Sequence, residues 1–462
     1  MSITLPAIER MDRRPPAPVP HVGPLGGLRL YRALRKNSIT AWRQEAYEEP
    51  YIADRNQIGG YVLLNDPDLI RRVFIDNAAN YPKDDLQLEK LEPAVGRGLL
   101  TADGESWRLQ RRTVAPLFQP AGVAGYLAPM AASVDEMLAR WSPGATLDFA
   151  REMTALTYDI ISRTVFSHEI ETPPEVMGEA ITTYFDALGR IDLWDVLPLP
   201  KWLPRPAFIR ARPAQKIFRE EVRRMLGRRR ARMAVGQAVP DDLVTRLMNA
   251  RDPEAGGPLS DTVIHDNLVT FIGAGHETTA NALTWTLFLL SEFPDADAQL
   301  AAEVKALGDG TPSADALAQL TQTRMILDES MRLYPPVPFM SRQAIGADRL
   351  GDCIVSPGTR ILIAPWVLHR HRKLWPDADL FRPERFAPER RGAIPRFAYL
   401  PFGAGARICV GMGFAIQEAL LAIAMIARRF RLTLVEGTNV MPFARMTLRP
   451  ANGLPMRIGL RP

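Results

Sequence analysis

The apolar and polar positions of this 462-residue chain follow a helical spacing over most of its length. Residues 121–235 keep this spacing, Met412–Phe430 reads as an apolar helix, and Ser260–Phe293 is the longest uninterrupted stretch. About thirty residues rising ~1.5 Å each would span a whole domain. Ser260–Phe293 is therefore predicted to be a central helix, with Ser260 as its N-cap.

Strand-like alternation is confined to short stretches. Tyr51–Asn65, with Gly59-Gly60 inside it, predicts a hairpin, and Val337–Ile345 predicts a single strand. Leu432–Leu460 predicts short strands with turns at Glu436-Gly437 and Asn452-Gly453. The chain is accordingly expected to be mainly α-helical with a small β region.

Other segments lack a clear period. Residues 1–30 are proline-rich and should run extended along the surface, ahead of a single domain at residues 31–462. Asp66-Pro67 is typical of a helix start. Tyr81–Gly98 is irregular and predicts a loop over a pocket. Ile191–Pro206 holds four prolines and two tryptophans, which fits either a mobile apolar loop near a substrate entrance or a packed structural loop.

Composition narrows the class of protein. Hydrophobic residues make up 47% of the chain, enough for a large core, and two cysteines fit a reducing cytosol rather than a disulfide framework. No signal peptide or membrane anchor is apparent, so a soluble cytoplasmic protein is expected. The net charge of +5 comes from dispersed arginines without a nucleic-acid module, which favours an acidic protein partner. Six arginines in Arg223–Arg232 predict a solvated helix face.

One of the two cysteines, Cys409, lies in a glycine-rich loop. The loop Phe402–Gly411 also contains Gly403, Gly405 and Arg407. Glycines allow the backbone to fold tightly around one sulfur, and amides turned towards it would favour the thiolate. A single thiolate cannot hold a structural zinc ion or an iron–sulfur cluster, but it can be the axial ligand of a heme. On its own, Cys409 would be interpreted as a buried structural cysteine, the commoner fate of a lone cysteine.

The loop resembles the heme-binding loop of the cytochrome P450 family, F-x-x-G-x-R-x-C-x-G, at every fixed position. The resemblance implies that Cys409 ligates the iron of heme b, in a loop whose fixed positions include Phe402 and Gly411. It also implies that Arg407 pairs with a heme propionate. Cys353 has no such context and is interpreted as structural.

The middle of the predicted central helix reads Ala274-Gly275-His276-Glu277-Thr278. Ala274 and Gly275 would leave room for a flat group, and a threonine four residues after Ala274 can bond its carbonyl. The segment is similar to the family's oxygen-activating A-G-x-E-T. This similarity implies that Thr278 and Glu277 deliver protons during catalysis, whereas His276 occupies the variable position.

Trp107 and Arg111 lie four residues apart, as on one face of an ordinary amphipathic helix. They also resemble the family's W-x-x-x-R segment, which implies that both bind a heme propionate. By the same resemblance Arg342 is the partner of the second propionate.

Glu329 and Arg332 form an E-x-x-R pair one turn apart, a pattern that also occurs by chance on many helices. Leu333-Tyr334-Pro335-Pro336 and the later Arg385 make the resemblance to the family specific. The implied role of Glu329, Arg332 and Arg385 is to fix the fold behind the heme.

Taken together, these segments are similar to the cytochrome P450 family from about Tyr51 to the C-terminus. The implied fold is one mainly helical domain with the heme between the central helix and the Cys409 loop. The implied reaction inserts one atom of O2 into a C–H bond, with electrons from a separate ferredoxin and ferredoxin reductase that use NAD(P)H. Two alternatives stay open, a peroxygenase that uses hydrogen peroxide and a non-catalytic heme sensor.

The sequence does not identify the substrate. Apolar side chains in Leu86–Leu99, Tyr184–Trp194, Phe271–Ala274 and Val337–Met340 are predicted to line its pocket, which suggests a lipid, terpenoid, steroid or aromatic molecule.

Overall fold

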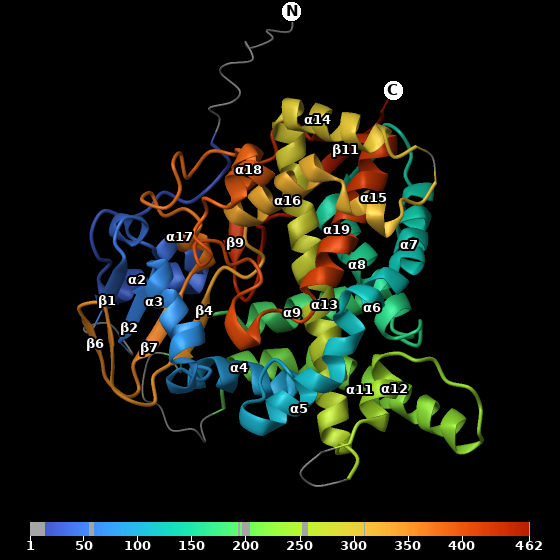
Figure 1. Cartoon of the computed structure of the whole chain (residues 1–462), viewed down its shortest axis with the longest axis horizontal. Coiled ribbons are helices and arrows are strands. Elements are labelled where there is room, and N and C mark those ends of the chain that lie inside the picture. Colours follow the sequence, from blue (N-terminus) through green and yellow to red (C-terminus); the bar gives the residue numbers. More distant parts are fainter. Residues whose placement is uncertain are drawn as a thin grey trace, which may run out of the picture.

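A computed structural model describes residues 14–54, 60–192, 195, 204–251, 257–308 and 310–461. Helices form most of the molecule, and small sheets lie mainly at one side (Figure 1). Within the described ranges, every helix is too short or too polar to cross a lipid bilayer. The mainly α-helical architecture with a small β region is as predicted.

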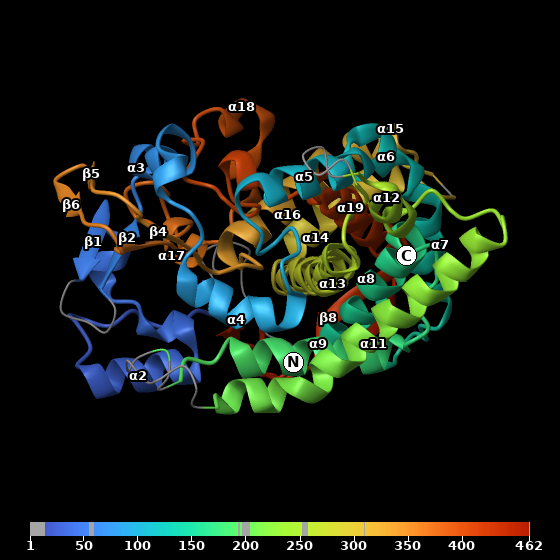
Figure 2. The ribbon, with the colours of Figure 1, turned by 90° about the horizontal axis from the view of Figure 1, so that it is seen from below.

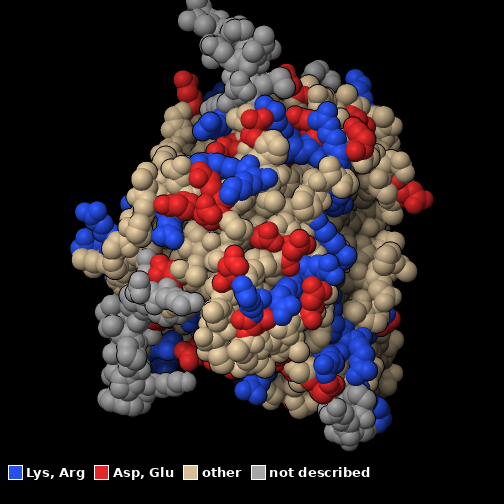
Figure 3. Space-filling view, turned by 60° about the vertical axis from the view of Figure 1, so that its left-hand side comes forward, with Lys and Arg blue, Asp and Glu red and all other residues tan. Residues whose placement is uncertain are grey.

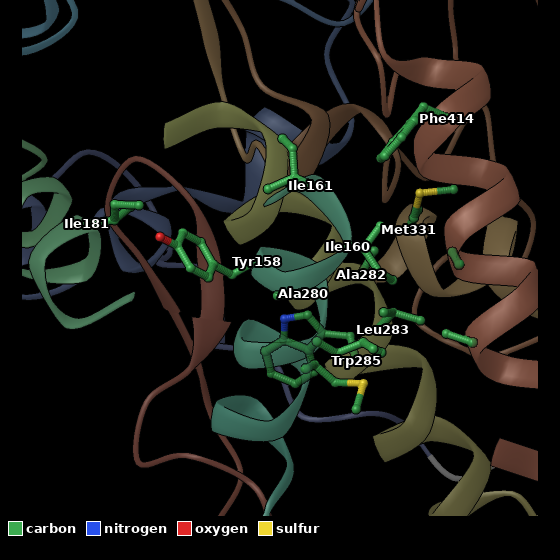
Figure 4. Packing of buried hydrophobic residues seen from close by; sticks show 14 of the residues in the cluster. Tyr158, Ile160, Ile161, Ile181, Ala280, Ala282, Leu283, Trp285, Met331 and Phe414 are labelled. Atoms are coloured by element: carbon green, nitrogen blue, oxygen red, sulfur yellow. The ribbon is translucent and has the colours of Figure 1, made fainter. Parts of the chain in front are cut away.

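The long helix α13 (Asp261–Glu292) runs through the centre of the helical part, and Figure 2 shows it nearly end-on among its neighbours. The Ser260 side chain accepts a hydrogen bond from the Val263 amide at 3.3 Å, so the predicted cap is confirmed. Helices α8 (Phe149–Val165), α16 (Thr321–Leu333) and α19 (Met412–Arg429) pack against it. Figure 4 shows their side chains meeting in the core, for example Ile160, Trp285 and Met331.

The other helices surround this core. They are α2 (Gly27–Lys36), α3 (Pro67–Arg71), α4 (Asp85–Val95), α5 (Gly104–Val114), α6 (Pro120–Gly125), α7 (Leu127–Ala139), α9 (Pro174–Leu188), α11 (Pro206–Ala234), α12 (Leu243–Asn249), α14 (Pro294–Lys305), α15 (Ala314–Ala318), α17 (Pro365–Leu368) and α18 (Pro388–Arg391). Short single-turn segments include η3 (Arg72–Asp76), which contacts the Cys409 loop, and η7 (Gly405–Arg407), which is part of that loop.

The largest described sheet has the strand order β1-β2-β7-β4. Strands β1 (Tyr51–Asp54) and β2 (Tyr61–Leu64) are antiparallel, with Tyr51 opposite Leu64. Strand β7 (Arg360–Ile363) runs parallel to β2 and antiparallel to β4 (Met340–Gln343). The predicted hairpin is thus confirmed, and the predicted strand Val337–Ile345 is shorter than expected.

Three smaller sheets complete the β region. The first has the order β3-β11-β8, formed by Thr146–Asp148, Pro455–Leu460 and Phe430–Leu434. The second pairs β9 (Pro442–Ala444) with β10 (Leu448–Pro450), and the third pairs β5 (Asp348–Leu350) with β6 (Cys353–Val355). Gly437 and Gly453 have positive φ angles at the predicted turns, as glycine allows.

Two predictions of local structure from the sequence are wrong. Tyr81–Gly98 was predicted to be a loop, but it contains α4, whose N-cap Asp84 accepts a hydrogen bond from the Leu86 amide. The interior Pro93 and the polar residues of this helix hide its period. Helix α2 begins at Gly27, inside the segment expected to be extended. Asp66, by contrast, caps α3 as predicted, and the segment Ile191–Pro206 lies largely outside the described residues.

The arginine run on α11 is not a purely solvated face. Arg229 is completely buried, and both of its terminal nitrogens bond the Asp242 carboxylate at 2.7 Å. Glu169 and Thr245 complete its shell. Each of the other five arginines in Arg223–Arg232 also has an acidic partner. Four of the six arginines pair with residues outside α11 and so help to fasten this helix to its neighbours.

The E-x-x-R pair lies at the centre of a buried network. Arg332 and Glu329 are both fully buried and make two hydrogen bonds of 2.7 Å. Arg332 also donates to the carbonyls of His369, Ala378 and Leu380. Arg385 Nε lies 3.5 Å from Glu329 Oε1, which agrees with the structural role that the family resemblance implies for Arg385. A buried pair needs such additional bonds to offset its desolvation.

Candidate active site

The Cys409 loop is held against η3 and cannot open without losing backbone contacts. The Cys409 amide donates to the Phe402 carbonyl at 2.9 Å. Gly403 and Gly405 have φ angles of +71° and +73°, and a Cβ on Gly405 would lie 2.3 Å from the Phe74 carbonyl oxygen. Glycine is therefore required at position 405 both by conformation and by space.

The Cys409 side chain is open to a cavity and lies beside groups that favour its thiolate. Burial raises the pKa of the thiol, while the Gly411 amide and the Arg111 guanidinium lower it. The expected effect of the backbone amide on the thiol pKa is therefore present, but burial opposes it and Arg111 adds to it. A coordinated metal ion would deprotonate the sulfur outright.

The cavity has a volume of about 370 Å³ and lies between α13 and the Cys409 loop. It brings together ten predicted site residues: Trp107, Arg111, Ala274, Gly275, Thr278, Arg342, Phe402, Arg407, Cys409 and Gly411. Much of its remaining lining is apolar and includes Phe118, Phe271, Val337 and Phe339. Of the predicted substrate-contacting ranges, Tyr184–Trp194 contributes no described residue to this lining.

Basic side chains gather at one end of the cavity. Arg111 Nη1 donates to the Ile408 carbonyl at 2.9 Å, which ties α5 to the Cys409 loop. Arg407 donates to the Ala102 carbonyl at 2.7 Å, pairs with Asp103, and stacks 4.3 Å from the Trp107 ring centroid. Burial lowers the pKa values of Arg111 and Arg407.

Arg342 on β4 adds a third arginine to this end of the cavity. It donates to the Ser341 carbonyl at 2.7 Å, and its guanidinium lies 5.0 Å from the centre of the Phe74 ring. Burial and repulsion by Arg407 lower its pKa to about 10.

Lys83 is a cavity residue that the sequence analysis missed. Burial, together with repulsion from Arg407 and Arg342, lowers its pKa to about 7. A lone lysine after Pro82, in a stretch interpreted as a loop, carries no signal that could have identified it. Four basic groups thus lie near a single carboxylate, Asp103. This excess of basic groups fits a ligand with two carboxylates, as heme has.

The small residues of α13 serve packing as well as the cavity. The Thr278 hydroxyl donates to the Ala274 carbonyl at 3.1 Å, as the four-residue spacing predicts. A Cβ on Gly275 would lie 2.0 Å from Ile161 Cδ1. Gly275 therefore lets α8 approach α13 closely, in addition to lining the cavity as predicted.

Glu277 does not line the cavity, although its neighbour Thr278 does. Its side chain is 5% exposed, and Oε1 accepts a 2.6 Å hydrogen bond from Thr447 between β9 and β10. Oε2 has no hydrogen-bond partner among the described residues. Burial raises the pKa of Glu277 to about 7, against the opposing effects of Thr447 and Arg449. The neighbouring His276 is buried, and desolvation lowers its pKa to about 4.

Glu277→Gln should stabilise the protein increasingly as pH rises. Because the folded-state pKa of about 7 exceeds the ordinary value of 4.5, the folded parent binds more protons than the unfolded chain between these values. The parent therefore loses stability from about pH 4.5 to pH 7, a loss that glutamine does not share. At ~1.4 kcal/mol per pKa unit, the difference at pH 8 is roughly 3 kcal/mol.

Urea unfolding of parent and Glu277→Gln at pH 5 and pH 8 measures this difference. Glu179→Gln on α9, at an exposed position, controls for the loss of a charge. Equal differences at the two pH values would show that Glu277 does not titrate as described.

Comparisons with known proteins agree with this site. The sequence model of the family described as cytochrome P450 matches residues 14–454. Cyclooctatin synthase from Streptomyces melanosporofaciens is 35% identical over 386 residues, which cover 83% of each chain. Pentalenene oxygenase from Streptomyces avermitilis is 32% identical over 399 residues, covering 86% of this chain and 87% of that protein. Cyclooctat-9-en-7-ol 5-monooxygenase from Streptomyces melanosporofaciens is 34% identical over 376 residues, covering 81% of this chain and 80% of that protein.

The family match spans nearly the whole described fold and includes the Cys409 loop, the central helix and the buried Glu329–Arg332 pair. The cavity between the loop and the helix carries the thiol and the basic groups that a heme requires. The chain therefore belongs to the cytochrome P450 family of heme-thiolate monooxygenases.

Proposed function

We propose that this protein hydroxylates a hydrophobic small molecule at a C–H bond, using O2 and electrons from a separate ferredoxin system. The observation that carries the proposal is the cavity itself, where Cys409 and four basic groups face Ala274 and Thr278 of α13. Proteins of this family bind heme b, which when bound supplies the activation of O2. Our proposal assigns the surrounding steps to residues of this chain.

Cys409 would hold the iron, and the basic end of the cavity would hold the propionates. Arg111 and Arg407 are fixed by the Ile408 and Ala102 carbonyls, so they are oriented before any ligand arrives. Arg342, Trp107 and Lys83 line the same end. Pairing with a carboxylate would also offset the mutual repulsion of these cations. The pKa of Lys83 would then rise, and its charged form would be favoured.

Thr278 and Glu277 would move protons. Thr278 lines the cavity, whereas Glu277 is buried outside the cavity lining with a pKa near neutrality. A group with such a pKa can both take up and release a proton at physiological pH. The side chain of Glu277 would have to turn from Thr447 towards Thr278 to complete the relay.

Thr278→Ala should keep heme and substrate binding but yield at least ~10-fold less product per NAD(P)H consumed, since positioned proton transfer typically contributes 10²–10⁴-fold. Its hydroxyl bonds only the Ala274 carbonyl, so its loss leaves no buried group unpaired. Product, hydrogen peroxide and NAD(P)H are measured together. Thr278→Ser keeps the hydroxyl and should restore coupling, and an unchanged ratio in Thr278→Ala would remove Thr278 from the relay.

A heme-thiolate peroxygenase would not need Thr278, and a heme sensor would need neither Thr278 nor Glu277. Both alternatives are therefore disfavoured by a threonine that lines the cavity next to a buried acid.

The substrate is proposed to be an apolar cyclic molecule of terpenoid type. The apolar lining from Phe118, Phe271, Val337 and Phe339 supports this, and the names of two relatives refer to pentalenene and cyclooctat-9-en-7-ol. Terpenoids, steroids, fatty acids and aromatic compounds can be screened for a low-to-high-spin shift of the heme spectrum. Cyclic hydrocarbons should give the largest shifts, and a response to fatty acids alone would contradict the assignment.

The electron donor is proposed to be an acidic ferredoxin that docks near α5, in the cytoplasm. Arg111 on this helix bonds the Cys409 loop, and Arg112 is exposed without an ion pair in the described part of the chain. Arg108, on the same helix, is paired with Glu105 and is therefore less available to a donor. Basic and acidic side chains are interspersed over the face shown in Figure 3, so neither sign of charge dominates that face.

Arg112→Glu should slow the first electron transfer at limiting ferredoxin, by several-fold at low salt and less at physiological ionic strength, where charges are screened beyond ~8 Å. Stopped-flow reduction rates against ferredoxin concentration measure this. Arg151→Glu, at a 90% exposed arginine on α8, is the matched control. Equal rates for Arg112→Glu and the parent at low salt would place the docking site elsewhere.

A further inference from the structure

A second hollow is lined by α2, by Arg190 just after α9, and by Arg445 in the turn that joins β9 to β10. Helix α2 lies at the lower edge of Figure 2, the same edge as α9 and α11. Five of its seven lining residues are basic, and the full set is Leu28, Tyr31, Arg32, Arg35, Lys36, Arg190 and Arg445. None of the five basic residues forms an ion pair with another described residue.

Arg445 is the buried member of this set. It is 4% exposed, yet its Nε and Nη1 atoms have no hydrogen-bond partner among the described residues. Asp186, the acidic residue whose charge acts on Arg445, accepts a 2.6 Å hydrogen bond from Arg449. The Arg445 guanidinium lies 4.5 Å from the centre of the Phe443 ring, a contact that does not satisfy its N–H donors. A buried cation with unused donors is costly unless a ligand completes it.

Helix α2 supplies the outer wall of the hollow. Leu28, Arg32, Arg35 and Lys36 recur at the spacing of one helical face, and the three basic residues are exposed. Leu28 is 63% exposed beside them. The face thus combines cationic groups with an apolar side chain.

The inner wall is rigid because the turn approaches α9 closely. A Cβ on Gly189 would lie 2.8 Å from both Arg445 Cβ and the Met446 amide nitrogen. The Arg445 amide also donates to the Thr447 carbonyl at 3.0 Å. Arg445 is therefore held in place before any ligand binds, which lowers the entropic cost of binding.

We propose that this hollow binds a multiply charged phosphate group, such as a diphosphate. Guanidinium groups match the geometry of phosphate oxygens, and five cations exceed what one carboxylate could neutralise. The same contacts would hold a soluble phosphate ester or the headgroup of an anionic phospholipid, with Leu28 then against the acyl region. The proposal is independent of the reaction at the heme.

The test uses the heme-loaded protein and inorganic pyrophosphate as the probe. Calorimetry should show saturable binding, and the midpoint of thermal unfolding should rise with pyrophosphate concentration. Arg445→Met should weaken binding by roughly tenfold or more, as expected for lost charge-assisted bonds. It should not lower the unfolding midpoint of the ligand-free protein, because it removes unpaired buried donors. A paired variant, Arg32→Met with Arg35→Met, changes only exposed residues and should weaken binding as well.

Vesicles separate the two sources. Co-sedimentation with phosphatidylcholine vesicles containing phosphatidic acid, but not with pure phosphatidylcholine, indicates a lipid headgroup. Pyrophosphate binding without vesicle binding indicates a soluble phosphate ester. Arg151→Met is the matched control for net charge. The proposal is overturned if neither probe binds, or if Arg445→Met and the α2 variant bind both probes as well as Arg151→Met does.

Discussion

Replacing Cys409 with serine should abolish the far red-shifted Soret band that the reduced protein gives with carbon monoxide. The band depends on a thiolate that pushes electron density onto the iron. In the structure, Cys409 is the one cysteine that lines the described cavity, beside the Gly411 amide and Arg111. Serine is nearly the same size but remains a weakly acidic alcohol. Substrate turnover should fall at least ~100-fold, since even second-shell changes at metal sites cost 10–100-fold.

Heme content should fall much less than the band, because the apolar lining and the basic residues Arg111, Arg342 and Arg407 do not depend on the sulfur. Heme extraction therefore accompanies the spectrum. Cys353→Ser, at the buried cysteine on β6, is the matched control and should keep the band. Survival of the band in Cys409→Ser would refute the assignment of the iron ligand.

Arg332→Ala should destabilise the protein by about 3–5 kcal/mol, the cost of breaking a buried ion pair. The change removes two 2.7 Å bonds to Glu329 and leaves the carbonyls of His369, Ala378 and Leu380 without their donor. It also leaves the Glu329 carboxylate buried with Arg385 at 3.5 Å as its remaining cation. We expect earlier unfolding in urea and loss of heme from the unfolded fraction.

Arg324→Ala on the same helix is the matched control. Arg324 is about one-third exposed and pairs at 2.9 Å with Asp328, which is buried but keeps Arg391 and the Tyr399 hydroxyl as partners. Because the buried carboxylate stays paired, the loss of Arg324 should cost less than the loss of Arg332. If the two alanine variants unfold at the same urea concentration, the buried pair does not hold the fold as described.

The parts predicted well from the sequence are those with fixed local spacing. The Cys409 loop needs its glycines because the backbone adopts positive φ angles at Gly403 and Gly405, and this requirement leaves a readable pattern. Ser260 and Asp66 are confirmed as helix caps. They could be predicted because a cap bonds an amide within the next three residues. The role of Arg385 was implied by the family resemblance, and in the structure it lies beside Glu329.

The parts that were missed depend on contacts between distant segments. Lys83 becomes a cavity residue only because β4 and the Cys409 loop bring Arg342 and Arg407 near it. Arg229 is buried because Asp242 and Glu169, 13 and 60 residues away, enclose it. The direction of Glu277 is fixed by Thr447, 170 residues later. Local sequence patterns do not reveal contacts between distant segments. The arginine run was therefore predicted to be solvent-exposed, and Glu277 was predicted to act in the site.

The most direct test of the central claim follows the source of the inserted oxygen atom. The heme-loaded protein is supplied with ferredoxin, ferredoxin reductase and NAD(P)H, and with a compound that gives the spin shift, under ¹⁸O2 in unlabelled water. Mass spectrometry of the product should show one ¹⁸O atom per hydroxyl group formed, and catalase should not reduce the yield. Unlabelled product, or product that forms only while hydrogen peroxide is present, would contradict the monooxygenase account.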